Sequence, residues 1–241
     1  MGAGEQTQQY MKGLRLPSNV KAFDTPHRVA LSKPFCMDAN EVVAKDYDAC
    51  VAQGSCSPTK VAMWTTSGGR FPEKPVNNVD WKQSRRYCQN LKKDLPTEAQ
   101  WEWAARGEDG RMFPWGNETP TCEHADFTPG VLEAPAADAG CHGGNASVVG
   151  THPKGDRVWP GGRIHDLAGN VWEWTLDNTA PYPEEGLTED PVVVSDIENS
   201  HMVRGGGWNR SGVGIKAAYR GSAVVGYQRP GLGFRCVRNP P

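Results

Sequence analysis

The stretch LPTEAQWEWAARG, residues 95–107, carries the clearest structural signal in this chain of 241 residues. Thr97 and Gln100 have the spacing of a capping box, in which each side chain bonds a free backbone amide at the start of a helix. Pro96 prevents a preceding helix from continuing, and Gly107 favours the end of this one. We therefore predict a helix that begins after Thr97 and ends at Gly107.

Shorter elements surround this helix. Asp80 is a good N-cap for a second helix, along which residues repeat with helical spacing at Trp81, Ser84, Cys88 and Leu91. Residues 41–54 fit a third, short helix that ends at Gly54. The apolar alternation within residues 27–38 predicts a strand.

The rest of the chain is dominated by turn-forming residues, since it contains 28 Gly and 19 Pro. We predict loops over residues 57–79, mostly turns over 108–162, and a tight turn leading into a strand over 162–177. Residues 202–238 indicate two or three further strands divided by glycine. The expected fold class is α+β: an irregular single domain over residues 1–241, with two main helices, short antiparallel sheets and little regular secondary structure.

Composition narrows the range of partners. The net charge is −2 with both signs mixed along the chain, so nothing favours nucleic acid or an anionic membrane as the main partner. No run of 18 apolar residues is present, and we expect no membrane span. Residues 1–13 are polar and contain no apolar signal-peptide core.

Cysteine usage indicates disulfides. Cys50 and Cys56 enclose a short loop, and Cys122 and Cys141 bracket a loop rich in Pro, Ala and Gly. We predict the disulfides Cys50–Cys56, Cys88–Cys236 and Cys122–Cys141, with Cys36 left as a free thiol. Such bridges imply an oxidising compartment, so the expected location is extracytoplasmic or secreted.

Two other uses of these cysteines remain open. All seven thiols stay reduced if the protein is cytosolic. A zinc site is the second alternative, with Cys122, His124, Cys141 and His142 as ligands. The spacing is not a common zinc pattern, and adjacent residues such as Cys141 and His142 point apart in an extended chain.

Five segments in order resemble the formylglycine-generating-enzyme, or sulfatase-modifying-factor, family. They are TPHRVALSKPFCMDANEVV (25–43), YCQNLKKDLPTEAQWEWAARG (87–107), MFPWGN (112–117), DLAGNVWEWTLD (166–177) and RGGGW…AAYR…GFRCVR (204–238). The resemblance spans nearly the whole chain and implies a C-type-lectin-like core. The family's domain opens with a strand ending in Met-Gly, and Met1-Gly2 stands where that strand would end. We therefore expect the first strand, and a signal peptide, to be missing from the sequence.

The resemblance also implies a structural Ca²⁺ ion at the 166–173 turn. Matched residue by residue, the ligands are the side chains of Asp166 and Glu173 and the backbone carbonyls of Gly169 and Val171. Oxygen ligands from a glycine-containing turn suit Ca²⁺. The alternative is a structural turn in which Glu173 caps backbone amides.

Two smaller expectations concern a further ion and the arginines. The resemblance points to a second ion near Asp126, Phe127 and Asp138. We expect Arg106, Arg220 and Arg235 to form structural ion pairs or to bond loops.

The segment WNRSGVGIKAAYR (208–220) departs from the family. In formylglycine-generating enzymes this stretch carries two cysteines that bind Cu(I) and activate O₂ to oxidise a cysteine of a sulfatase. Here it contains no cysteine: the first position falls near Arg210 and the second near Gly214 or Ile215. We therefore expect no copper and no formylglycine-generating activity by that route.

The first hypothesis is a calcium-stabilised, non-catalytic module that binds a protein or a small molecule. Its expected contact residues, which we call the C-terminal surface, are Trp208, Asn209, Arg210, Tyr219, Tyr227 and Arg229, because Tyr and Arg are frequent at interfaces. The pattern RGGGW…R…GFR over residues 204–235 also resembles the variable proteins of diversity-generating retroelements. The alternative is that this segment is a plain surface loop. Two other functions stay open: an oxidoreductase of the same family with a different metal site, supplied by Cys36 or His, and an accessory partner of a sulfatase, kinase or surface complex.

Overall fold

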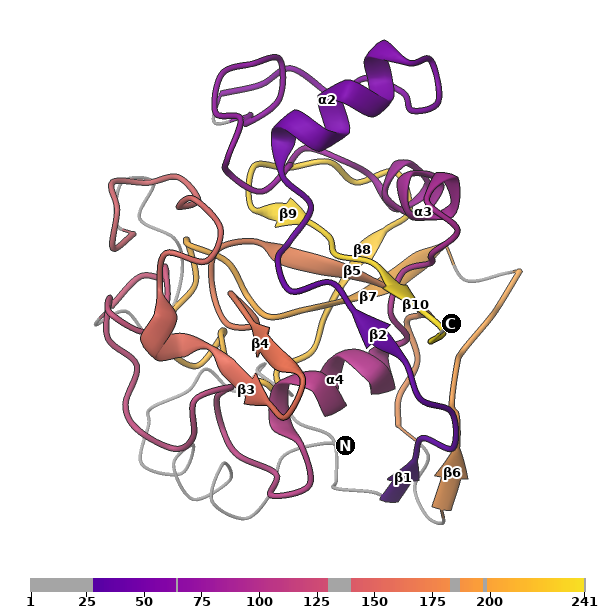
Figure 1. Cartoon of the computed structure of the whole chain (residues 1–241), viewed down its shortest axis with the longest axis vertical. Helices are drawn as coiled ribbons and strands as arrows, with labels where there is room; N and C mark the ends of the chain where they lie inside the picture. The colour runs from indigo at the N-terminus through magenta and orange to yellow at the C-terminus, as the bar shows by residue number, and fades with distance from the viewer. Residues whose placement is uncertain (1–27, 64, 130–139, 183–186, 197–198, 241) are drawn as a thin grey trace.

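The structure is a computed structural model, and it describes residues 28–63, 65–129, 140–182, 187–196 and 199–240 (Figure 1). Its described part contains three α-helices: α2 (Ala44–Ala52), α3 (Trp81–Asn90) and α4 (Glu98–Arg106). The two main helices are therefore confirmed, and the short helix expected over residues 41–54 is α2.

Both predicted helix starts are formed as capping boxes. The Asp80 side chain accepts a hydrogen bond from the Gln83 amide, and the Gln83 side chain accepts one from the Asp80 amide. Thr97 and Gln100 make the same reciprocal pair at the start of α4. Gly107 follows α4 with a φ of 61°, where a Cβ atom would lie 2.3 Å from a guanidinium nitrogen of Arg157. Local sequence thus fixes where these helices begin and end.

A four-stranded sheet lies at the centre of the fold (Figure 1). Its strand order is β8 (Gly221–Val224), β7 (Ser200–Arg204), β5 (Trp172–Asn178) and β9 (Leu232–Gly233). Three two-stranded pairs accompany it: β1 (Arg28–Ala30) with β6 (Leu187–Glu189), β2 (Cys36–Met37) with β10 (Val237–Arg238), and β3 (Arg157–Trp159) with β4 (Gly162–Ile164). A 3₁₀ turn, η1 (Pro153–Gly155), precedes β3.

Three details of the expected strands were wrong. The pairs β1–β6 and β5–β9 are parallel rather than antiparallel, because these partners are far apart in the chain and no hairpin turn sets their direction. The strand expected over residues 27–38 is divided into β1 and β2, with Pro34, which has no amide to donate, in the gap. The described part of the 202–238 region contributes to four strands rather than two or three.

The largest core cluster lies between the central sheet, α2 and α3. Its aromatic members Tyr47, Tyr87 and Phe234 have ring centroids 5.5–6.4 Å apart, and Trp174 of β5 is fully buried beside them. α4 covers another part of the sheet and buries Trp101 completely. Buried aromatic side chains thus stabilise a fold that has few long elements.

The three predicted disulfides are present in the structure. They join Cys50 to Cys56, Cys88 to Cys236 and Cys122 to Cys141, and Cys36 is a free, exposed thiol on β2. The zinc alternative was therefore wrong, because two of its four ligands are bonded to each other. The Cys88–Cys236 bridge ties α3 to the C-terminal segment across 148 residues of sequence. Among the helices described, none has the length and apolar character needed to cross a bilayer.

Candidate functional site

The 166–171 turn enters the centre of the fold with an unusual backbone. Asp166, Gly169 and Asn170 have φ angles of 55°, 83° and 56°. Gly169 is required, because a Cβ atom there would lie 2.3 Å from the carbonyl oxygen of Asp126. Asn170 is fully buried, and its side-chain amide donates to Glu41 at 2.6 Å. The turn is held by buried polar contacts and directs Val171 and the following strand into the core.

Glu173 lies beyond this turn and is fully buried in an ion pair. Its carboxylate accepts hydrogen bonds from Nε and Nη2 of Arg235 and from the indole nitrogen of Trp101, each at 2.8 Å. The predicted alternative, Glu173 as a cap for backbone amides, was wrong: its partners are a guanidinium and an indole. Arg235 thereby fulfils its expected role as a structural ion-pair partner.

Glu41 is a member of this site that the sequence did not reveal. Burial raises the pKa of Glu41 well above its usual value, and the negative charges of Asp166 and Glu173 raise it further. Asp166 accepts a hydrogen bond from the Gly150 amide at 2.6 Å. The carboxylates of Glu41, Asp166 and Glu173 therefore lie close together. The positive charge of Arg235 partly offsets their negative charge. Glu41 lies in the 25–43 segment that resembles the family, but that resemblance did not place it beside Asp166, which lies 125 residues further along the chain.

The oxygen donors of this turn are of the type that Ca²⁺ prefers, but the four predicted ligands are not equally available to an ion. Carboxylate and carbonyl oxygens are the ligands that Ca²⁺ prefers, and the excess of negative charge favours a cation. Glu173 is the least available of the four predicted ligands, because Arg235 and Trp101 already occupy both of its oxygens. Among the described side chains, no group of three or more His, Cys, Asp or Glu is arranged to hold a metal ion. Any ion here would therefore depend on Asp166 and backbone carbonyls.

The second expected ion site is only partly described. Asp126 is buried, accepts a hydrogen bond from the Ser147 hydroxyl at 2.7 Å and lies 3.7 Å from Nδ1 of His142. Burial raises the pKa of Asp126. Phe127 packs in a separate hydrophobic cluster, and Asp138 lies outside the described residues.

A second buried ion network lies under α4. Arg204 pairs with Glu98 and Glu102, and Arg220 pairs with Glu98 through two nitrogens. Arg106 also pairs with Glu102, so the expected structural roles of Arg106 and Arg220 are confirmed. Burial raises the pKa of Glu102, but the charges of Arg204 and Arg106 lower it more, to about 2. We call Arg204, Arg220 and Arg235, with their glutamate partners, the arginine core.

The C-terminal surface brings its six predicted residues into one region with different exposures. Trp208 is buried against Ala146 and Val171, and Tyr227 is exposed; the other four, Asn209, Arg210, Tyr219 and Arg229, are half-buried. The Arg210 guanidinium lies 5.6 Å from the ring centroid of Trp172, which the sequence reasoning did not include. The ring centroid of Trp172 is 5.9 Å from that of Tyr219.

No cysteine sulfur occupies this segment. Gly214 and Ile215 are buried, and Ile215 packs in a hydrophobic cluster with Phe113. Cys236 is held in its disulfide, and Cys36 is exposed on β2. The family's copper-binding pair therefore has no counterpart among the residues at these positions.

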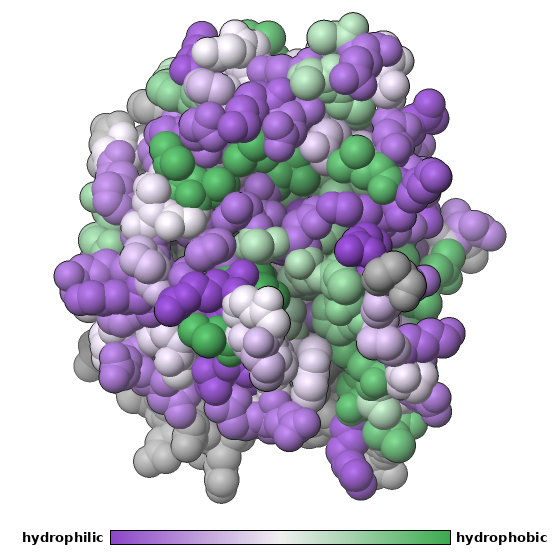
Figure 2. Space-filling view, viewed as in Figure 1, coloured by the Kyte–Doolittle hydropathy of each residue, from purple (hydrophilic) through white to green (hydrophobic). Residues whose placement is uncertain are grey.

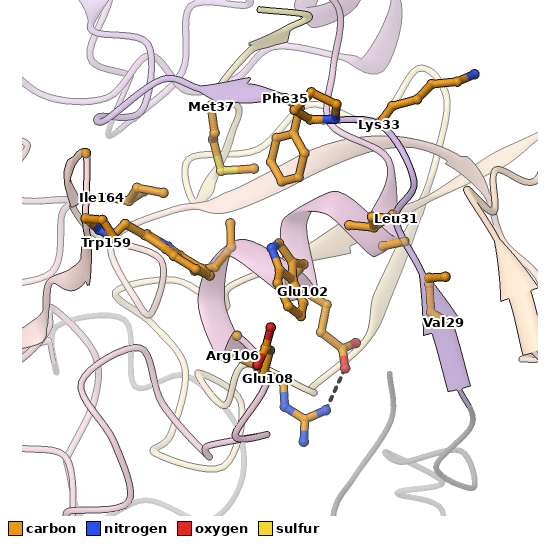
Figure 3. Close-up of a pocket in the computed structure, with 18 of the residues that line it drawn as sticks. Val29, Leu31, Lys33, Phe35, Met37, Glu102, Arg106, Glu108, Trp159 and Ile164 are labelled. Carbon is orange, nitrogen blue, oxygen red and sulfur yellow. Dashed lines mark hydrogen bonds and ion pairs between the residues drawn. The ribbon is translucent and has the colours of Figure 1, made fainter.

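The structure also contains a large groove that the sequence did not predict. It has a volume of about 1330 Å³ and lies between β1–β2, α4 and the β3–β4 hairpin. Figure 3 shows Leu31, Phe35 and Met37 directed toward α4, and the Glu102–Arg106 ion pair on its lower side. On this face hydrophobic side chains gather in patches between hydrophilic ones (Figure 2). None of the predicted ligand-binding residues lines this groove.

Comparison with known sequences identifies relatives along most of the chain. The formylglycine-generating enzyme of Thermomonospora curvata is 40% identical over 184 residues, which cover 70% of this chain and 57% of the relative. The inactive C-alpha-formylglycine-generating enzyme 2 of Bos taurus is 38% identical over 125 residues, covering 49% of this chain and 40% of the relative. The chain thus spans about half the length of the curated relatives it matches.

Solved structures share the fold at lower identity. PvdO from Pseudomonas aeruginosa superposes with a TM-score of 0.68 at 22% identity, covering 88% of this chain and 83% of PvdO. Treponema denticola variable protein 1 superposes with a TM-score of 0.65 at 20% identity, covering 94% and 92% of the two chains. The expected α+β architecture of this family is confirmed.

The family match extends over nearly the whole sequence. The sequence model described as the sulfatase-modifying factor enzyme 1-like domain matches residues 3–240. Its span includes the Asp166–Glu173 turn, the arginine core and the C-terminal surface. The chain therefore belongs to the sulfatase-modifying factor enzyme 1-like domain family.

Proposed function

We propose that this chain is a non-catalytic member of the family that binds a protein or small-molecule ligand at its C-terminal surface. The observation that carries the proposal is the absence of cysteine from residues 208–220, together with the engagement of Cys236 in a disulfide. Soft thiolate ligands are what Cu(I) requires. Relatives named inactive formylglycine-generating enzymes, such as the bovine one, support a non-catalytic role.

An oxidation assay tests the non-catalytic part. The purified protein, with its disulfides intact, is loaded with Cu(I) and incubated under O₂ with a cysteine-containing peptide, and the peptide is followed by mass spectrometry. We expect no copper-dependent oxidation beyond that of a C36S variant, which controls for chemistry at the free thiol. Sustained turnover, or stoichiometric copper or iron in the protein as purified, would overturn the proposal in favour of an oxidoreductase with a different metal site.

We further propose that a structural Ca²⁺ ion binds at the 166–173 turn. The Asp166 carboxylate and the Gly169 and Val171 carbonyls would hold it, and the ion would offset the negative charge shared by Glu41, Asp166 and Glu173. A ligand that binds only the folded state stabilises it by mass action, by about 2.7 kcal/mol at 100 times Kd. We expect Ca²⁺ to raise the melting temperature and chelation with EGTA to lower it.

Two variants sharpen the calcium test. Asp166→Asn removes one charge from the turn and should weaken the calcium response, whereas Asp46→Asn, an exposed change on α2, should leave it intact. An unchanged melting temperature of the wild-type protein across calcium and EGTA would remove Ca²⁺ from the proposal. The binding function at the C-terminal surface would be unaffected by that result.

The disulfides support an extracytoplasmic location. Three bridges among the described residues are expected where the environment is oxidising. Thiol titration of the denatured protein, isolated from its native cells with free thiols blocked, should count one thiol. A count of seven would place the protein in a reducing compartment.

A further inference from the structure

Two arginines of the C-terminal surface differ from Arg106, Arg204, Arg220 and Arg235, which are all paired with glutamates. Neither Arg210 nor Arg229 has a carboxylate within ion-pair distance in the described part of the chain. Arg229 lies 5.5 Å from the ring centroid of Tyr227, and Arg210 lies over Trp172. Burial lowers the pKa of Arg210, and the positive charge of Arg229 lowers it further. The two guanidiniums therefore repel each other without an acid to compensate them.

Unsatisfied hydrogen-bond donors gather around this pair. The Nε atoms of Arg210 and Arg229 and the indole nitrogens of Trp172 and Trp208 are all buried without a hydrogen-bond partner in the protein. Leaving a buried donor unpaired costs about 1–3 kcal/mol, and more for a charged group. Four such donors in one region indicate a missing acceptor. One acceptor, the side-chain oxygen of Asn209, is also buried without a partner.

Two glycines bring these groups together. A Cβ atom on Gly231 would lie 3.7 Å from the indole nitrogen of Trp208 and 3.5 Å from the side-chain oxygen of Asn209. A Cβ atom on Gly207 would lie 3.4 Å from both the Gly231 carbonyl oxygen and Cδ1 of Trp172. The indole nitrogen of Trp208 and the side-chain oxygen of Asn209 thus lie beside Gly231, and the pyrrole edge of Trp172 lies beside Gly207, which contacts the Gly231 carbonyl.

We propose that Arg210 and Arg229, with the indole nitrogens of Trp172 and Trp208, bind the carboxylate of a ligand whose adjacent N–H or O–H group donates to Asn209. This inference rests on the proposed binding function and names the chemistry of its ligand. Guanidinium groups match the planar carboxylate geometry and form short, charge-assisted hydrogen bonds. The flanking aromatic rings of Trp172 and Tyr219 provide contact area for the organic part of such a ligand.

The mixture of donors and one acceptor favours a carboxylate over a phosphate. A fully ionised phosphate group, such as a phosphate monoester dianion, presents only acceptors, so the Asn209 oxygen would be left facing one of them. A dianion also costs more to remove from water than a monoanion at a half-buried site. An amide or hydroxyl beside a carboxylate, as in an acidic peptide or a hydroxy acid, supplies both kinds of group.

Calorimetric titration with defined probes tests the ligand class. The probes are sodium acetate, N-acetylglutamate, inorganic phosphate, and two capped tripeptides, acetyl-Gly-Glu-Gly-amide and acetyl-Gly-Gln-Gly-amide. We expect the glutamate probes to bind more tightly than phosphate, and the glutamine peptide to bind at least about tenfold more weakly than its acidic counterpart. A tighter response to N-acetylglutamate than to the peptide points to a small organic acid, and the reverse points to a partner protein; both support the inference.

Substitutions locate the site. Arg210→Gln and Arg229→Gln should each weaken binding of the tighter glutamate probe by about tenfold or more, because each removes a charged donor. Arg70→Gln is the matched control, since it makes the same change at an exposed arginine. Arg210→Lys keeps the charge but loses the planar fork and should still weaken binding, which separates specific recognition from net charge. Thermal melts of each variant without ligand establish that it folds.

Three outcomes would overturn the inference. They are tighter binding of phosphate than of any carboxylate, equal binding of the glutamate and glutamine peptides, and equal losses in the Arg70 and Arg210 variants. If the protein binds only neutral ligands at this surface, the carboxylate assignment fails while the non-catalytic binding function stands. Copper-dependent peptide oxidation would instead defeat the proposed function.

Discussion

The arginine core and the C-terminal surface use the same side chain in opposite ways. In the core, Arg204 and Arg235 are fully buried, and each is bonded to at least one glutamate. At the surface, Arg210 and Arg229 are half-buried and have no acidic partner among the described residues. A buried guanidinium with its carboxylate is part of the structure, whereas one that lacks a carboxylate is available to a ligand. The difference separates arginines that hold the fold from arginines that we propose recognise a ligand.

The largest expected effect comes from breaking the core. Glu173→Gln should lower the free energy of unfolding by about 3–5 kcal/mol, because it removes the one carboxylate that is hydrogen-bonded to the buried guanidinium of Arg235 among the described residues. Urea denaturation measures the change. Glu73→Gln is the control: Glu73 forms an exposed pair with Lys45, and losing it should cost about 1 kcal/mol or less. A loss in Glu173→Gln no larger than that of the control would contradict the structural role of the core.

The second-largest expected effect concerns Asp177, a buried acid of β5 at the start of α4 that forms no ion pair with an arginine among the described residues. Burial raises the pKa of Asp177 to about 6, although its carboxylate accepts hydrogen bonds from the amides of Glu98 and Val193. Between pH 4 and pH 6 the folded state therefore binds more protons than the unfolded state. The free energy of unfolding should fall as the pH rises through this range, by an amount on the order of 3 kcal/mol.

The slope of stability against pH, rather than stability itself, is the measurement for this prediction. Asp177→Asn should lower stability at low pH, since one of the two amides loses its acceptor, and this loss should shrink as the pH rises because the variant lacks this part of the slope. Asp46→Asn, at an exposed position, should keep the wild-type slope. An unchanged slope in Asp177→Asn would show that Asp177 is ionised normally in the folded protein.

The smallest expected effect is at the C-terminal surface. Without ligand, Arg210→Gln and Arg229→Gln should each change the free energy of unfolding by about 1 kcal/mol or less, because no ion pair is lost and repulsion between like charges is relieved. Arg220→Gln makes the same change in the core, where it breaks two bonds to Glu98, and should cost several times more. Equal losses at the three positions would erase the distinction between the two regions.

Local sequence patterns predicted the elements that local chemistry decides. The capping residues Asp80 and Thr97 place the starts of α3 and α4, and Gly107 places the end of α4. The three disulfides were predicted from the positions of their cysteines within loops and elements. Features of this kind depend on residues a few positions apart or on one strongly constrained bond, so the sequence alone contains them.

Contacts between distant parts of the chain could not be predicted from the sequence. Parallel pairing of β5 with β9 and of β1 with β6 depends on how distant strands meet. Glu41 joins the Asp166 turn from 125 residues upstream through a hydrogen bond to Asn170. The groove beside α4 is likewise assembled from several separate segments. None of these contacts leaves a periodic pattern that a single sequence displays.

The sequence by itself determined the family resemblance, the helix caps and the absence of the copper-binding cysteines, because each of these depends only on which residue stands at each position. Only the tertiary structure decided which arginines have acids beside them. Charge pairing depends on distances across the fold. Arg210 and Arg235 are the same residue type in the sequence and differ only in the side chains that surround them. That difference in surroundings makes one guanidinium a structural partner of Glu173 and leaves the other free of any acid among the described residues.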